Sequence, residues 1–190
     1  MRGDSKIGLV PLGKISDREL LEFLSRRLFE IFGREVEISA RFPSPQYAFE
    51  ERRGQYHSAS ILLRLRTAFE GIYERVLGIT EVDLFAPSLH FVFGEADLLH
   101  GMAVISLFRL RPENYGLPES SSLLHHRALK EATHELGHTY GLMHCHQYRC
   151  VMHFSNSLSD TDRKSHLFCR RCQSSLTVAL TSAPRRGEKR

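Results

Sequence analysis

One short pattern constrains this chain more than any other: His-Glu-x-x-His-x-x-Gly-x-x-His, which runs from His134 to His144. In an α-helix, residues four positions apart project from the same face, so His134 and His138 would converge on one ion. Gly141 would end that helix, because glycine adopts the left-handed conformation at little cost. The turn would then bring His144 to the same ion. Three neutral nitrogen ligands and an open fourth position are typical of a catalytic zinc site.

The residue beside the first histidine indicates which reaction such a site would perform. Glu135 lies about 100° around the helix from His134, so its carboxylate flanks the ion without being a ligand. Zinc lowers the pKa of its bound water to about 7 and polarises a carbonyl oxygen. Glu135 is the expected general base, which takes the proton of that water and passes it to the leaving amine. The pattern therefore predicts hydrolysis of peptide or amide bonds. The alternative is a helix with two surface histidines and a third in a loop, which chance rarely arranges in this pattern.

Four cysteines form two closely spaced pairs, Cys145-x4-Cys150 and Cys169-x2-Cys172. Four thiolates make a closed tetrahedral set that suits a structural zinc ion. Disulfide bonds, in any of three connectivities, are the alternative. Four cysteines already complete a zinc shell, so we expect the neighbouring histidines to be bystanders: His146, His153 and His166.

Taken together, these positions resemble the metzincin signature, which combines the histidine pattern with a downstream methionine turn. Met152 lies where that turn is expected, and with the four cysteines the chain is similar to the archaemetzincin family. The similarity runs from about residue 6 to 172 and includes Phe91–Glu95 and Phe154–Ser157. It implies a catalytic zinc on the three signature histidines, Glu135 as the general base, and a second, structural zinc on the four cysteines. Some other metzincins carry a tyrosine where this chain has Phe154, so no phenol can act from that position.

Hydrophobic patterning predicts a strand, a helix and a second strand at the start of the chain. Residues 7–12 are a buried apolar run. The helix would begin at a capping box of Ser16 and Glu19 and end near Gly33. Residues 35–40 alternate as a half-buried strand does. We expect the two strands to be parallel and joined by a right-handed crossover.

Further along, the pattern predicts a loop over residues 41–54 and a helix over 58–76, in which Gly71 is a candidate break. Strands are expected over 82–85, 89–93 and 103–110, and the active-site helix over 122–140. That helix would face the sheet with apolar side chains at helical spacing: Leu124, Ala128, Ala132, Leu136 and Tyr140. His125 and His126 are expected at the surface. With the resemblance, these elements imply an α+β (α/β-like) fold with a metzincin-type twisted mixed sheet of about five strands.

Length and composition fit one domain, because 190 residues with 42% hydrophobic content can bury a core. We expect a single catalytic domain over residues 1–180. Its N-terminal subdomain would end at about residue 141, and its small C-terminal subdomain, from about 142 to 180, would hold the methionine turn and the four cysteines. Leu176 and its neighbours suggest a closing helix or turn. Residues 181–190 are expected to be a disordered basic tail.

The charge and the apolar runs exclude several classes of protein. The net charge is +4, and four basic residues against Glu188 in the tail supply +3 of it, so the body is nearly neutral. Nucleic-acid binding is therefore not expected. No apolar run is long enough for a signal peptide or a membrane span. We expect a monomer in the cytoplasm with reduced cysteines and no membrane partner.

The expected partner is a peptide substrate. In metzincins an antiparallel edge strand above the zinc pairs with an extended substrate, so by resemblance Leu89–Gly94 would supply backbone partners for it. The alternative is that this strand only forms a hairpin with the next one.

Two other functions compete with the zinc peptidase. One is a zinc-stabilised interaction protein with little or no peptidase activity, but a structural site would not need Glu135. The other is a zinc-finger nucleic-acid binder. It is disfavoured because acidic residues offset the basic residues near the cysteines: Asp160 and Asp162 against Arg163, Lys164, Arg170 and Arg171.

Overall fold

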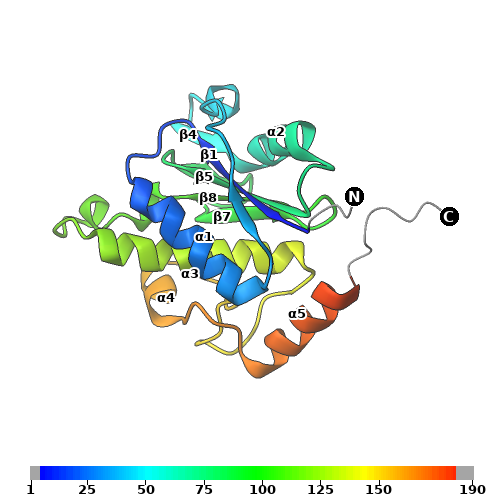
Figure 1. Cartoon of the computed structure of the whole chain (residues 1–190). Coiled ribbons are helices and arrows are strands. Elements are labelled where there is room, and N and C mark those ends of the chain that lie inside the picture. The colour runs from blue at the N-terminus through cyan, green and yellow to red at the C-terminus, as the bar shows by residue number, and fades with distance from the viewer. Residues whose placement is uncertain (1–4, 183–190) are drawn as a thin grey trace.

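The first three elements form the predicted strand–helix–strand unit (Figure 1). The computed structural model describes residues 5–182 of the chain. Strand β1 (Ile7–Leu12) is followed by helix α1 (Arg18–Phe32) and strand β2 (Val36–Ile38). The two strands are parallel, with Ile7 opposite Val36. Gly33, in the left-handed conformation at φ 61°, ends α1 as predicted.

The predicted cap of α1 was one residue out. The N-cap is Asp17 rather than Ser16, and its carboxylate accepts a hydrogen bond from the Leu20 backbone N–H at 3.0 Å. The other oxygen of that carboxylate lies 2.7 Å from Nε2 of His125. The expectation that His125 is a surface residue was therefore wrong, because it is half-buried against Asp17, whereas His126 is exposed.

Five strands form a mixed sheet in the order β2-β1-β5-β8-β7, which confirms the predicted fold class. Strands β5 (Arg75–Thr80) and β8 (Met102–Ser106) continue the parallel part of the sheet. Strand β7 (Gly94–Asp97) pairs with β8 in the antiparallel direction and lies at the end of the sheet. The sheet therefore has an antiparallel edge strand.

Three of the predicted elements differ in the structure: two have other boundaries and one is not formed. Helix α2 (Ser58–Phe69) ends seven residues before the predicted 76, and after a turn at Gly71 the chain enters central strand β5. Residues 89–93 form no strand; Val92 makes only a single bridge to Leu84. The strand predicted over 103–110 ends at Ser106 and is followed by a 3-10 turn, η2 (Phe108–Leu110).

The predicted loop over residues 41–54 contains part of a second, smaller sheet. A 3-10 turn, η1 (Gln46–Ala48), leads into strand β3 (Phe49–Glu50), which forms an antiparallel hairpin with strand β4 (Gln55–His57). β4 pairs in turn with strand β6 (Leu84–Phe85), which lies within the predicted third strand. This small sheet lies next to the segment that was expected to be the edge strand.

Helices cover both faces of the large sheet (Figure 1). α1 and the long helix α3 (Ser121–Thr139) lie on one face and α2 on the other. A further 3-10 turn, η3 (Pro112–Tyr115), precedes α3, whose N-cap is Ser120. The predicted core face of α3 is confirmed, since all five of its apolar side chains are buried: Leu124, Ala128, Ala132, Leu136 and Tyr140.

The chain after α3 is mostly irregular until two further helices, α4 (Leu158–Arg163) and α5 (Arg170–Ser182). α5 is the closing helix expected after the second cysteine pair, and Leu176 is its deeply buried apolar residue. Of the predicted tail, residues 181 and 182 end α5, and 183–190 lie outside the described residues. Among the helices of the described chain, none has the length and apolar content needed to cross a membrane.

The observed cap predicts which residue stabilises α1. Asp17→Ala should lower the free energy of unfolding by about 1–2 kcal/mol, because the Leu20 N–H loses its acceptor. Glu19→Ala, at the residue expected from the capping-box pattern, should change it by less than about 0.5 kcal/mol, since Glu19 is exposed. Urea denaturation of both variants measures the difference. Equal destabilisation by the two substitutions would contradict the assigned cap.

Candidate active site

The end of α3 brings the three signature histidines together. His134 and His138 lie on one face of the helix, which ends at Thr139. Gly141, at φ 87°, donates its N–H to the His138 carbonyl at 2.9 Å and turns the chain back. One ring nitrogen from each of His134, His138 and His144 lies within 4.8 Å of the others.

Two backbone carbonyls fix the orientation of the helical histidines. His134 Nδ1 lies 2.7 Å from the Val151 carbonyl oxygen, and His138 Nδ1 lies 2.7 Å from that of Leu142. Each Nδ1 is therefore a donor, and each Nε2 is free to be a metal ligand. The two Nε2 atoms are 3.1 Å apart, close to the ~3.3 Å that Zn–N bonds of about 2.0–2.1 Å give in a tetrahedron. The residues present fit a zinc ion.

Burial also favours the ligand form of these histidines. It lowers the pKa of His134 well below its ordinary value, and it lowers the pKa of His138 and of His144. Burial disfavours the protonated imidazolium, so the rings are neutral near pH 7. Neutral imidazole is the form that binds a metal.

Glu135 is held in a tight space against the edge strand. It is buried, and a Cβ atom added at Gly94 on β7 would lie only 2.6 Å from Glu135 Cγ and 2.9 Å from Oε1. A glycine is therefore needed where the strand passes the carboxylate. Burial raises the pKa of Glu135 well above its ordinary value, and the Glu131 carboxylate raises it further. The sequence pattern predicted no separate role for Gly94, although this residue lies in the segment Phe91–Glu95 that resembles the archaemetzincin family.

Met152 lies beneath the histidines. Its side chain is fully buried, and its sulfur would be 2.6 Å from a Cβ atom added at Gly137, on α3 between the two helical histidines. The Met152 carbonyl accepts a hydrogen bond from the Cys145 N–H at 2.8 Å. The turn that contains Met152 therefore supports the helix from below and binds the segment that follows His144.

The four cysteines meet next to this turn. Their sulfur atoms all lie within 4.8 Å of one another, and Cys145 Sγ is 3.9 Å from Cys169 Sγ. Zn–S bonds of about 2.3 Å place sulfur atoms about 3.8 Å apart in a tetrahedron, so the cluster fits zinc. All four cysteines are free rather than disulfide-bonded. The nearby histidines make other contacts: His153 Nδ1 lies 2.9 Å from the Cys145 carbonyl, and His166 contacts Arg27.

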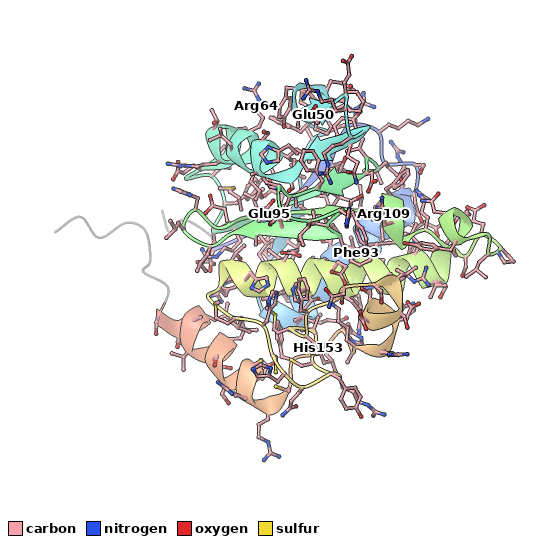
Figure 2. The ribbon with its side chains drawn as sticks, turned by 180° about the vertical axis from the view of Figure 1, so that it is seen from behind. Glu50, Arg64, Phe93, Glu95, Arg109 and His153 are labelled. Carbon is pink, nitrogen blue, oxygen red and sulfur yellow. The ribbon has the colours of Figure 1, made fainter. Side chains whose placement is uncertain are left out.

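A cavity of about 210 Å³ opens beside the histidines. Residues 89–94 form one wall, α3 contributes Glu131, His134 and Glu135, and residues 154–156 form the opposite wall. Figure 2 shows Phe93 on the sheet side of α3 and His153 on the other side, in the segment after the helix. A molecule bound in this cavity would therefore lie next to His134 and Glu135.

Side chains bind the backbone at the start of the segment 89–93, which is not a strand. Arg53 Nη2 donates to the carbonyls of Leu89 and His90 at 2.9 and 3.0 Å, and Gln55 Nε2 donates to the His90 carbonyl at 3.0 Å. Arg109, paired with Asp83, lies over the Phe91 ring at 4.3 Å. These backbone groups are occupied by side chains. The prediction that Leu89–Gly94 is the edge strand was therefore wrong; the edge strand is Gly94–Asp97.

A His-Glu-x-x-His helix, a third histidine after a glycine turn and a buried methionine below them define a zinc metallopeptidase of the metzincin class. Comparison with known proteins gives the family. The model of Peptidase family M54 matches residues 38–178. The archaemetzincin of Methanocaldococcus jannaschii is 48% identical over 88% of this chain and 90% of its own length, and that of Pyrococcus furiosus is 43% identical over 90% and 92%.

Solved structures agree with these relatives. The archaemetzincin of Methanopyrus kandleri superimposes with a TM-score of 0.83 at 41% identity, over 94% of this chain and 97% of that one. A zinc-dependent peptidase from Methanocorpusculum labreanum gives the same TM-score at 30% identity, over 90% and 99%. The chain belongs to Peptidase family M54, the archaemetzincins, and is a zinc metallopeptidase.

The close approach of β7 to α3 predicts the effect of a single methyl group. Gly94→Ala should lower kcat/KM by about 100-fold, because the added Cβ displaces Glu135 and a displacement of about 1 Å has effects of that size. Zinc content and the far-ultraviolet circular dichroism spectrum should be unchanged. Steady-state kinetics with elemental analysis measure both. Full activity of this variant would show that the position of Glu135 tolerates the displacement.

Proposed function

We propose that this chain hydrolyses peptide bonds at a zinc ion held by His134, His138 and His144, with Glu135 as the general base. The observation that carries the proposal is the convergence of the three imidazole nitrogens, together with a cavity that His134 and the buried carboxylate of Glu135 both line. Zinc bound there would polarise the scissile carbonyl and lower the pKa of a water molecule. The chain's own residues then orient the ligands, exclude bulk water and move the proton.

Glu135 is placed to move that proton. It follows His134 directly on α3 and lines the same cavity, so it can take a proton from the attacking water and deliver it to the leaving amine. Gly94 and the backbone of β7 limit its motion on one side. A carboxylate held in this way meets the geometric requirement for a general base.

We further propose that an extended peptide pairs with the outer edge of β7 (Gly94–Asp97) rather than with residues 89–93. β7 ends the five-stranded sheet within the described residues, and its first residue lies against Glu135. Backbone pairing with a free strand edge is a common mode of peptide recognition. The peptide would thus pass the catalytic carboxylate.

The second proposed zinc ion, on the four cysteines, connects the site to the rest of the C-terminal segment. Cys145 follows His144 directly, and Met152 lies two residues after Cys150. A structural zinc on these cysteines would therefore fix both the third histidine and the support below α3. Such ions contribute about 10–16 kcal/mol of apparent binding free energy, comparable to the stability of a whole domain.

The proposed domain organisation is a single catalytic domain over residues 1–180, divided into subdomains near residue 141. Residues from the C-terminal part belong to the same apolar core as the large sheet and α3: Val151, Met152, Cys172 and Leu176. Such a shared core supports one domain. Monomeric state, cytoplasmic location and the absence of nucleic-acid partners stay predictions.

Metal analysis and activity of one variant test the general base. Glu135→Gln keeps the shape of the side chain but cannot accept the proton, so we expect kcat to fall about 100- to 10,000-fold on a mixed peptide library. Elemental analysis should give two zinc ions per chain in both proteins. Glu22→Gln, an exposed acid on α1, is the matched control. One zinc per chain and no cleavage by the wild type would instead indicate an interaction protein.

Removal of one cysteine tests the coupling of the two metal sites. Cys169→Ser should unfold residues 142–177 and lose both metals, because the third histidine is tied to the cysteine cluster. Hydrogen exchange of that segment and elemental analysis measure the outcome. A variant that retained its full catalytic zinc would refute the coupling. Cys169 is not one of the three histidines proposed to hold the catalytic zinc, so loss of that zinc would not come from a missing ligand.

A further inference from the structure

A buried ion pair lies behind the catalytic histidines. The Lys164 side chain is fully buried, and its Nζ atom lies 3.0 Å from Oε1 of Glu131, which is 2% exposed. The Thr161 hydroxyl donates to the same oxygen at 3.0 Å. The ammonium and the hydroxyl thus contact the same oxygen of Glu131.

Stability alone does not explain this pair. Burying two charges has a desolvation cost that their attraction often fails to exceed. Other contacts already attach the α4 region to α3: Arg127 makes two hydrogen bonds of 2.8 Å to the Asp162 carboxylate, and Lys130 donates to the Thr161 and Asp162 carbonyls at 3.0 and 2.9 Å. The pair is not needed as a link between the two helices. The buried ammonium does, however, hold one oxygen of the Glu131 carboxylate in a fixed position.

Glu131 also lines the cavity of the catalytic site. It lies one helical turn before Glu135, and aromatic rings line the same cavity: Phe91, Phe93 and Phe154. Lys164 and Thr161 contact Oε1, and within residues 5–182 no hydrogen bond is made to Oε2, so Oε2 is the oxygen available to a ligand in the cavity. The cavity thus combines apolar walls with the fixed carboxylate of Glu131, in addition to that of Glu135. A side chain that fits it has a long apolar stem and an N–H donor at its tip.

We propose that Glu131 is a specificity-determining residue that accepts a hydrogen bond from a lysine or arginine side chain next to the scissile bond. The inference rests on the proposed function, since it assigns the substrate class of that site. A site built to bind a donor rejects an analogue without one, because its buried acceptor is then left unpaired. An acidic side chain is rejected by repulsion.

The test compares peptides that differ at one position. Fluorogenic peptides carry lysine, arginine, norleucine or glutamate in turn on either side of the cleaved bond. Wild-type enzyme should prefer lysine over norleucine by about 10- to 100-fold in kcat/KM, the value expected for a hydrogen bond to a charged group. Glu131→Gln should reduce that preference at least tenfold, whereas Glu22→Gln, the matched control on α1, should retain it.

A second variant addresses folding, because Glu131→Gln leaves the buried Lys164 ammonium without its partner. The double variant Glu131→Leu, Lys164→Met replaces the ion pair by apolar side chains of similar size, a change that proteins often tolerate. It should fold and should prefer norleucine over lysine. A lysine preference that survives in both Glu131 variants would overturn the proposal.

Equilibrium binding separates this inference from the proposed function. Calorimetry with zinc-loaded Glu135→Gln protein should show tighter binding of the lysine peptide than of the norleucine peptide, by about the same factor. If wild type cleaves nothing while this preference is present, the proposed function fails and the role of Glu131 stands. If the wild type cleaves peptides and the two dissociation constants are equal, the role of Glu131 fails alone. If the wild type cleaves no peptide and no peptide binds, both fail.

Discussion

Helix α3 is buried between the large sheet and the C-terminal segment, and this packing positions the candidate active site. Its apolar side chains pack into the main core with α1 and the sheet. The opposite side presents His134 and His138 to the segment that follows the helix. Because the helix is packed on both sides and backbone carbonyls contact both Nδ1 atoms, contacts within the protein orient these imidazoles. Preorganisation of this kind lowers the cost of forming the site.

The segment after α3 then acts on the histidines through its backbone. The Leu142 and Val151 carbonyls orient His138 and His134, and the Met152 side chain lies directly beneath Gly137. These three residues are distributed along the same stretch as the first cysteine pair. A metal on the cysteines would therefore stabilise carbonyls that orient the other metal's ligands. The two sites are physically connected even though they share no ligand.

The substrate side of the site is built differently, from polar side chains with long sequence separations. Arg53 and Gln55 hold the carbonyls of Leu89 and His90, and Lys164 holds Glu131. These contacts have two consequences for the binding of a substrate. The first leaves β7 as the strand edge, and the second leaves one carboxylate oxygen for a ligand. Selection of a substrate thus depends on contacts that the signature motif does not contain.

Sequence pattern alone predicted the class of enzyme and the local elements with strong periodicity. The spacing of His134, His138, Gly141 and His144 is a property of one helix and one turn, so it can be derived without tertiary information. The same holds for α1, α3 and the first two strands. The resemblance in the cysteines and Met152 led to the family that the comparisons show.

The position of the edge strand, the end of α2 and the surroundings of Gly94 and Glu131 depend on tertiary contacts. Val76 fits a helical stripe as well as a buried strand, and the choice depends on pairing with β1 and β8. Residues 89–93 have the composition of a strand, but Arg53, nearly forty residues away, donates hydrogen bonds to the carbonyls of Leu89 and His90. The physical reason is the same in each case. Hydrogen bonds and close approaches between distant residues overrule local preference, and no local pattern encodes them.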